Sequence, residues 1–532
     1  MSRTTISTGE IPFSLDSKQT QSENSRVEQV SPKTSGRRPG SEAPLRIALV
    51  GDFSGRASRG IRESQQLGRR KIIEIDRDNF EEVFSELQPT LQLELDQKAI
   101  HFREYDDLHP DYIYERVPLF DDLQTLKRRL GRPEQFRVAA DEIRQWASYK
   151  EELNAPQASQ KNEAERSVET DNQQAYAIPA DMFDAVLSNS QASLAQQSTC
   201  SNSPVSNINQ LIKDIVAPYV EPKADPRVGE MQSAVDEATT ALMRRILHAP
   251  AFQNLEATWR SVYFLVRRLE TNAKLKLYLV DVTCDEVLDD LDSAKNIEDT
   301  GLYSLLVEKD QVKGGVPFGV INVDFPIANN DEDLHVALLF TTIASANNGA
   351  AIAGASSVLA GCDSFGESED CSDWNVTLED VFLENWQDLR RDPVAAHLAL
   401  TAPRVLTRLP YGQRSSPIES FPFEELPSSN KHEYYTWGSS AYVVTLLLAQ
   451  SYQKFGWQGL GQIRQVDDLP LHVYDDNGET TIKPCAEQMM RDSGASRLLQ
   501  MGLLPVRSVA RSTSVVVPDF SSVARTGASL FS

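Results

Sequence analysis

Two long polar stretches divide the chain and limit what it can fold into. Residues 1–44 and 151–204 consist largely of polar side chains, Gly, Pro and Ala, without apolar periodicity. Such segments cannot bury enough apolar surface to offset the entropy lost on ordering. We therefore predict a disordered N-terminal tail (1–44), a first folded block (45–150), a flexible linker (151–204), a second folded block (205–510) and a C-terminal tail (511–532).

The first block has an α/β pattern. Alternating leucine and isoleucine over 45–49 predict a strand, which ends in the turn 51–56 (GDFSGR). Apolar residues share one helical face over 80–87, and two short strands are expected within 91–102. A helix opened by a proline follows at 118–130.

In the second block, the spacing of apolar residues is typical of helices in some stretches and of strands in others. Apolar residues recur every three to four positions over 231–246 and again over 252–269, which predicts two consecutive helices. Strands are expected at 275–279 and 317–325, and further helices at 334–346 and 439–455. The fold class predicted for both blocks is mixed α/β.

Charge argues against a general nucleic-acid binder, because the formal net charge is -24 and phosphate binding requires clustered Lys and Arg. The region 363–388 holds nine Asp or Glu residues and no Lys or Arg. It is either a solvated loop or a surface that receives a basic partner.

Compartment signals favour a soluble, cytoplasmic protein without direct membrane insertion. The longest apolar stretches, such as 441–449, are shorter than the roughly 20 residues of a membrane span. The N-terminus lacks the apolar core of a secretory signal. The cysteines are scattered and never spaced C-x-x-C, so we expect reduced thiols rather than a disulfide framework or a zinc site; they are Cys200, Cys284, Cys362, Cys371 and Cys485.

Catalytic motifs are incomplete throughout. The turn 51–56 follows a strand but lacks the spacing and lysine of a phosphate loop, so a structural turn is expected. Residues 354–358 fail the nucleophile-elbow pattern and 459–461 lack the third glycine of a dinucleotide fingerprint. No two histidines lie within five residues of each other, which excludes a helical i, i+4 metal pair. We predict no catalytic, cofactor-binding or metal-binding residues and no cofactor.

Several conspicuous residues have a structural interpretation instead. His248 is expected to pack or cap at a helix junction, and 106–111 (DDLHPD) to form a turn with a helix cap. Core packing is expected for four tryptophans: Trp259, Trp386, Trp437 and Trp457.

Motifs in both blocks resemble the sheath families of bacterial type VI secretion systems. In the first block, 51–56, 73–80 (IEIDRDNF) and 106–111 resemble the small sheath subunit, TssB or VipA. In the second block, 246–260 (ILHAPAFQNLEATWR) closely resembles the large subunit, TssC or VipB. Three further stretches match the large subunit: 314–319, 403–412 and 437–442. Compared with these families, the resemblance to the small subunit begins at Leu45. The chain ends at Ser532, short of the C-terminal region with which the resemblance leads us to expect a large subunit to finish.

The resemblance implies a non-enzymatic component of a contractile sheath. Its implied partners are other sheath subunits, an inner tube, baseplate proteins and an AAA+ disassembly ATPase. The alternative is a sheath-like accessory, cap or baseplate adaptor, and an enzyme is a distant third possibility. In a supporting role, Trp259 is expected to build the core, and Arg260, Arg404 and Arg408 to form fixed ion pairs whose partner carboxylates the sequence does not name.

Overall fold

The computed structural model describes most of both blocks. The described residues are 6–7, 12–13, 43–93, 99–132, 135–143, 228–309, 315–368, 370–427, 431–476, 478–525 and 527–531. The predicted linker 151–204 lies outside them. The chain forms two compact units, one built from Met1–Val117 together with Met243–Ser532, and one from Pro118–Leu242. We call them the sheet unit and the helical unit.

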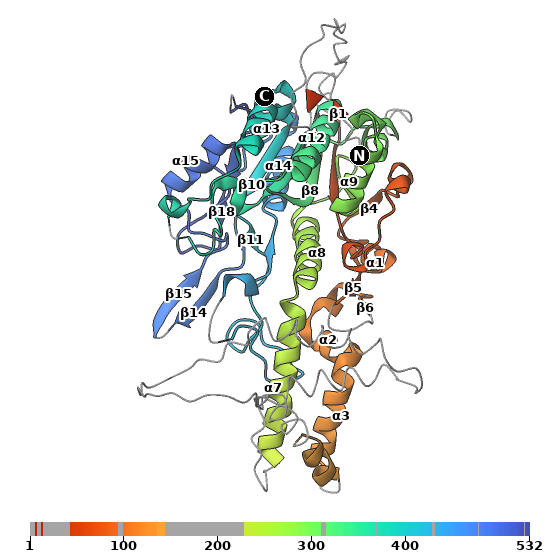
Figure 1. Cartoon of the computed structure of the whole chain (residues 1–532), viewed down its shortest axis with the longest axis vertical. Helices are drawn as coiled ribbons and strands as arrows, with labels where there is room; N and C mark the ends of the chain where they lie inside the picture. The colour runs from red at the N-terminus through yellow and green to blue at the C-terminus, as the bar shows by residue number, and fades with distance from the viewer. Residues whose placement is uncertain are drawn as a thin grey trace, which may run out of the picture. The chain divides into compact units, whose positions relative to one another are not determined.

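A seven-stranded sheet is the centre of the sheet unit, and the first block contributes two of its strands, one inside the sheet and one at its edge (Figure 1). The strand order is β16-β10-β9-β8-β3-β7-β4. All neighbours pair in parallel except β4 with β7. The strands are β3 (Leu45–Gly51), β4 (Ile73–Ile75), β7 (Leu275–Asp281), β8 (Val320–Ile327), β9 (Ala350–Ala355), β10 (Leu398–Ala402) and β16 (Leu503–Pro505).

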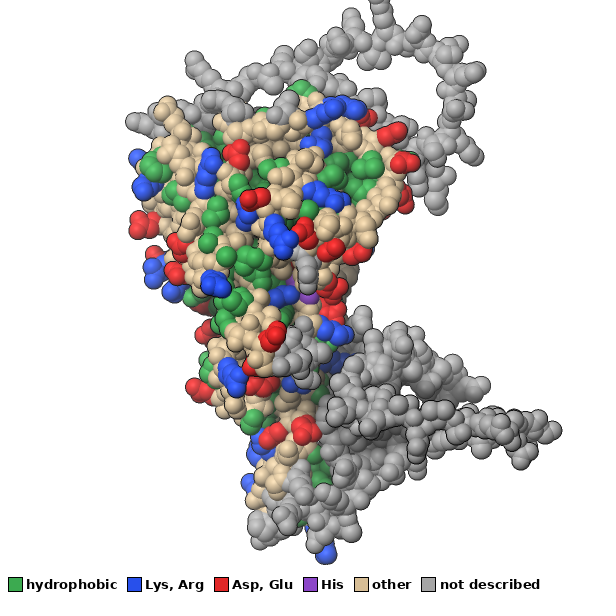
Figure 2. Space-filling view, turned by 90° about the vertical axis from the view of Figure 1, so that its left-hand side faces the viewer, with side chains coloured by type: hydrophobic (Ala, Val, Ile, Leu, Met, Phe, Trp, Pro, Cys, Tyr) green, Lys and Arg blue, Asp and Glu red, His purple; other side chains and the backbone are tan. Residues whose placement is uncertain are grey.

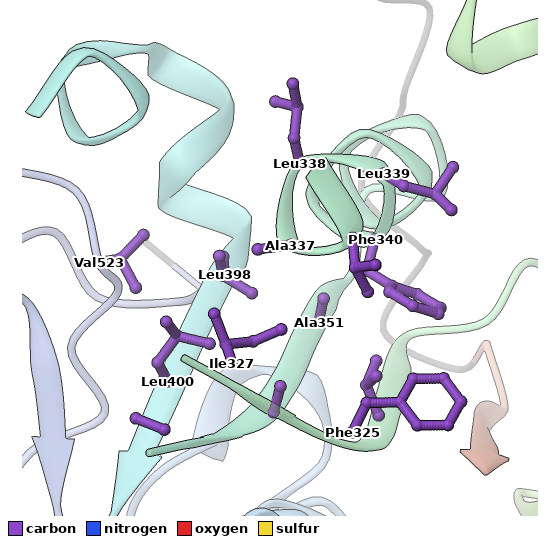
Figure 3. Packing of buried hydrophobic residues seen from close by; sticks show 14 of the residues in the cluster. Phe325, Ile327, Ala337, Leu338, Leu339, Phe340, Ala351, Leu398, Leu400 and Val523 are labelled. Atoms are coloured by element: carbon purple, nitrogen blue, oxygen red, sulfur yellow. The ribbon is translucent and has the colours of Figure 1, made fainter. Parts of the chain in front are cut away.

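Helices cover both faces of this sheet, which explains why β3 is apolar on both sides. On one face, α8 (Pro250–Arg268) and α14 (Ala441–Phe455) pack together, and Asn322 of β8 donates to Thr445 Oγ1 of α14 at 2.8 Å. On the other face, α12 (Asp331–Ala346) lies against β8, β9 and β10. Figure 3 shows Ala337 and Phe340 of α12 above Ala351 and Leu398 of the strands, all buried.

Shorter elements surround the sheet. The remaining helices of the sheet unit are α1 (Phe80–Leu87), α2 (Pro110–Arg116), α9 (Cys284–Ser293), α10 (Gly301–Tyr303), α13 (Asp380–Arg391) and α15 (Asp492–Met501). The small sheets pair β1 (Ile6–Ser7) with β2 (Pro12–Phe13), β5 (Thr90–Gln92) with β6 (Ala99–His101), β11 (Val405–Leu406) with β12 (Trp437–Gly438), β14 (His472–Asp476) with β15 (Glu479–Lys483), and β18 (Val515–Val516) with both β13 (Gln465–Val466) and β17 (Arg507–Ser508).

The helical unit contains α3 (Asp121–Leu130) and most of α7 (Val228–Leu247). The α3 face formed by Leu123, Leu126 and Leu130 is buried. Lys127 of α3 pairs with Asp236 of α7 at 2.6 Å. This unit therefore also combines residues from both blocks.

The predicted mixed α/β class is confirmed, and several predicted elements match closely, including the strand at Leu45, the helix at 80–87 and the helix junction at His248. Whether 45–150 and 205–510 fold as separate domains stays a prediction. The structure does show that their residues share one sheet.

Two segments differ from what the sequence suggested. The segment expected as a C-terminal tail is packed, because Val515, Val517 and Val523 are fully buried. The acidic region 363–388 is only partly a loop, since α13 begins at Asp380, covers its C-terminal part and buries Phe382 and Trp386. Among the described residues, no helix is both long and apolar enough to cross a membrane.

Candidate functional site

The most conspicuous polar site of the second block is a buried ion-pair cluster, which we call the Arg408 cluster. Its first members lie one turn apart on α8, where Arg260 Nε donates to Glu256 Oε1 at 2.8 Å. Arg408 Nε donates to the same oxygen at 2.8 Å, and its Nη1 and Nη2 reach Glu425 at 2.6 and 2.8 Å. The side chains of Glu256, Arg408 and Glu425 are at most 7% exposed.

Further hydrogen bonds satisfy this cluster. Thr436 Oγ1 donates to Glu256 at 3.2 Å, and the Tyr411 backbone N–H donates to Glu425 at 2.7 Å. Burial alone would raise the pKa of Glu256, but the charges of Arg408 and Arg260 hold that pKa below its ordinary value. Two carboxylates thus face two guanidinium groups, and the cluster is neutral as a whole.

His248 packs beside this cluster, as expected from its place before Pro250. Its ring stacks on Tyr434 with centroids 4.3 Å apart. Burial, together with the nearby charges of Arg408 and Arg244, lowers the pKa of His248 to about 3. The imidazole is therefore neutral at physiological pH and serves packing.

Arg404, the third arginine that the sequence analysis selected, belongs to a separate pair. Its Nε and Nη2 donate to Glu487 Oε1 at 2.9 and 2.6 Å, and His432 Nε2 lies 2.9 Å from the same oxygen. Burial opposes ionisation of Glu487, but the charge of Arg404 and the hydrogen bond from His432 lower its pKa to about 2. All three arginines form the ion pairs that the sequence analysis expected, and the structure supplies their carboxylates.

A second buried cluster joins the first block to the second, and we call it the Glu286 cluster. Glu286 lies in the first turn of α9, where Thr283 and Glu286 form a capping box. Arg56 Nη2 donates to it at 2.8 Å and Arg70 Nη1 at 2.8 Å. Burial would raise the pKa of Glu286, but these hydrogen bonds outweigh it and lower the pKa to about 2. The sequence analysis did not identify this site. The motif Thr-x-x-Glu at 283–286 could have indicated the start of α9, but not the two arginine partners of Glu286.

The turn 51–56 is held by the second block. Asp281, at the end of β7, accepts hydrogen bonds from the backbone N–H groups of Phe53 and Ser54 at 2.8 and 3.0 Å. It also accepts from Ser54 Oγ at 2.7 Å. Since a protein carboxylate already uses these N–H groups, a phosphate cannot bind them as it does in a phosphate loop. The turn is structural, with Gly55 at a φ of 72°.

Trp259 completes the junction between the blocks. It is fully buried, and its Nε1 donates to Phe53 O at 2.8 Å. Its ring lies 4.5 to 5.9 Å, between centroids, from Phe53, Phe80 and Phe84 of the first block. The core role predicted for Trp259 is confirmed, as are those for Trp386 and Trp437, which are 1% and 7% exposed. Trp457 differs, because it is only half-buried.

Two of the cysteines in the described part of the chain lie in the protein interior. Cys362 and Cys485 are buried, and burial raises the pKa of Cys485 to about 11, which disfavours its thiolate. Within the described ranges, no group of three or more His, Cys, Asp or Glu side chains could hold a metal ion. On the face shown in Figure 2, basic and acidic side chains are interspersed rather than gathered into one basic surface.

Fold and site together define a mixed α/β protein whose buried charges hold its own segments together. Comparison with known proteins specifies the family. Residues 230–524 match the family VipB, described as EvpB/VC_A0108, tail sheath N-terminal domain, and residues 19–145 match the family T6SS_VipA, described as type VI secretion system, VipA, VC_A0107 or Hcp2. Since the first match covers more than half of the chain, this chain belongs to the VipB family of tail sheath proteins.

A curated relative agrees with this assignment. The type VI secretion system sheath protein TssC1 of Pseudomonas aeruginosa is 28% identical over 282 residues, which is 52% of this chain and 57% of TssC1. The resemblance to both sheath families is thereby confirmed. One detail was wrong: the VipA match begins at residue 19 rather than at Leu45, because the polar residues before β3 carry no periodicity that a motif search could detect.

Proposed function

We propose that this chain is a structural subunit of a type VI secretion contractile sheath, assembling in the cytoplasm with further sheath subunits around an inner tube. One observation carries the proposal: the chain matches both sheath families, over 19–145 and 230–524, and the two matched parts share one sheet. A helical polymer requires heterologous interfaces, in which two different surfaces of the subunit meet and the contacts continue without closing.

The buried clusters suit a subunit that moves as a rigid body. Sheath contraction would release free energy stored in contacts between subunits, and a subunit that deformed would dissipate part of it. The Arg408 and Glu286 clusters resist deformation, because leaving one buried charge unpaired costs about 3 to 5 kcal/mol. No step in this mechanism requires a catalytic residue.

The same proposal implies partners other than sheath subunits. We expect inner-tube and baseplate proteins to contact the assembled sheath, and an AAA+ ATPase to disassemble it. We also expect α13 to contribute to assembly, because Val381 is 62% exposed beside the acidic residues Asp380 and Glu384. A basic surface on a neighbouring subunit would complement this face.

Co-expression with the neighbouring genes, followed by negative-stain electron microscopy, tests the proposal. Tubules containing the chain are the expected result, whereas small complexes of fixed stoichiometry would indicate an accessory, cap or adaptor. A monodisperse monomer in the presence of all sheath, tube and baseplate partners would contradict both. Detectable nucleotide turnover would revive the enzyme hypothesis.

A matched pair of variants tests the α13 contact. Asp380→Lys with Glu384→Lys should shorten or abolish tubules if α13 meets a basic neighbour. Asp78→Lys with Glu82→Lys is the control, because this pair has the same spacing at the start of α1 and is also exposed. Equal tubule yields from the two variants would exclude α13 as an assembly contact.

A further inference from the structure

The slot between β7 and β8 is filled by a strand of the same chain. Leu45 to Gly51 pair in parallel with Leu275 to Asp281 on one side, and Ile47 to Val50 pair with Val320 to Val323 on the other. Without β3, two strands of the second block would each lose a neighbour in the middle of the sheet. Unpaired strand edges are the usual sites of strand addition by another chain.

Residues of the second block also bind the chain on both sides of β3. Before the strand, the carbonyl oxygen of Ala43 accepts from Tyr452 Oη at 2.8 Å and from Trp457 Nε1 at 2.6 Å. After the strand, Asp281 binds the backbone of Phe53 and Ser54, and Glu286 binds Arg56. Partly buried hydrogen bonds and an ion pair thus fix both ends of the segment, and strand pairing holds its middle.

The compact units do not follow the family boundaries. The VipA match ends at residue 145, yet the sheet unit takes the chain only to Val117 and then resumes at Met243. Within the helical unit, Lys127 of the VipA match pairs with Asp236 of the VipB match at 2.6 Å. Each compact unit therefore contains parts of both matches, as expected of an obligate interface.

We infer that residues 43–117 permanently occupy this slot in cis, so that the intact chain takes no separate VipA-type subunit and polymerises as a single-chain repeat. The inference rests on the proposed sheath function and specifies its stoichiometry. In this arrangement the linker connects the two blocks covalently, but the contacts within the sheet hold them together. Cutting it leaves the assembled slot intact.

The test cleaves the full-length folded chain at a sequence-specific protease site introduced within 151–204. Both fragments should elute together at a one-to-one ratio under native conditions and separate only in denaturant. Separation under native conditions would overturn the inference. A mixture of two nicked preparations with different tags should keep its original pairs, and rapid scrambling of the tags would show that the slot is open to other chains.

A variant and its control show whether the described contacts hold the fragments. Arg56→Ala should accelerate fragment separation in the nicked chain roughly a hundredfold, because it leaves Glu286 buried with less charge compensation. Arg62→Ala removes only exposed pairs, with Asp285 and Asp289, and should leave the rate nearly unchanged. Equal rates for both variants would refute the assignment of these contacts.

These results are separable from the sheath proposal. Nicked fragments that stay together in a chain that never forms tubules would reject the sheath function alone. Tubules that incorporate an added VipA-type subunit in stoichiometric amount would reject the single-chain repeat alone.

Discussion

The Arg408 and Glu286 clusters use the same chemistry for different tasks. Both place a buried carboxylate between two guanidinium groups, Glu256 between Arg260 and Arg408, and Glu286 between Arg56 and Arg70. The Arg408 cluster lies wholly within the second block, whereas the Glu286 cluster ties the first block to it. A buried ion-pair cluster can therefore either stabilise one block internally or hold two blocks together.

This difference predicts two kinds of failure. Damage to the Arg408 cluster should loosen the second block while the two blocks remain joined. Damage to the junction formed by β3, Trp259 and Glu286 should also release the first block after the linker is cut. Unfolding free energy and fragment retention therefore report on the two clusters separately.

The largest effect is expected for Trp259→Ala at the junction. The variant should lose about 5 kcal/mol of unfolding free energy, because an aromatic cavity opens and the hydrogen bond to Phe53 is lost. Chemical denaturation measures the loss, and nicked fragments should separate readily. Trp259→Phe, which keeps most of the ring packing, should lose much less. A variant that melts like the parent would show that Trp259 is not a core residue.

Arg408→Ala should cost about 3 to 4 kcal/mol, because Glu256 and Glu425 are left buried with too little positive charge. Unfolding in urea gives the magnitude. The nicked fragments should nevertheless stay together under native conditions. Arg391→Ala, which removes an exposed i, i+3 pair, is the control and should be nearly neutral. Release of the first block by Arg408→Ala would erase the distinction between the two clusters.

Glu286→Gln should lower stability by about 2 to 3 kcal/mol at pH 7. The pKa of Glu286 is about 2 in the folded chain and starts from an ordinary value of 4.5. Its stabilisation is therefore complete above pH 4.5 and is lost as the pH falls toward 2. Parent and variant should differ most at neutral pH and converge near pH 2. A difference that stays constant with pH would mean that the carboxylate charge is not responsible.

The smallest expected effect has the opposite sign. Asp324 of β8 lies beside Gly51 of β3 and accepts from Thr258 Oγ1 at 2.6 Å. Desolvation raises its pKa to about 7, so the folded chain favours the protonated form and stability falls as the pH rises from about 4 to 7. Asp324→Asn should gain about 1 to 2 kcal/mol at pH 8 and little at pH 4. No gain at pH 8 in thermal unfolding would contradict the raised pKa.

Local patterns predicted the elements well because each depends on neighbouring residues. The alternation at 45–49, the stripe at 80–87 and the proline at 250 are sufficient to predict β3, α1 and the start of α8. The pair Glu256 and Arg260 has the i, i+4 spacing of a helical ion pair and could have been identified from sequence.

Pairings between residues far apart in the sequence could not be predicted from local patterns. Nothing in the residues around Arg408 indicates that Glu256, 152 positions away, is its partner. Likewise, the apolar character of β3 on both faces is compatible with any central position in a sheet. Only the three-dimensional pairing with β7 and β8 shows that the two blocks build one sheet.

The central position of β3 also has a consequence for biosynthesis. Leu45 pairs with Leu275, about 230 residues later, and Ile47 with Val320. At translation rates of about 5 to 20 residues per second, β3 leaves the ribosome roughly 10 to 50 seconds before its first partner strand. During that interval an apolar strand is without its neighbours, so the nascent chain should depend on chaperones, and the yield of folded protein should rise when they are abundant.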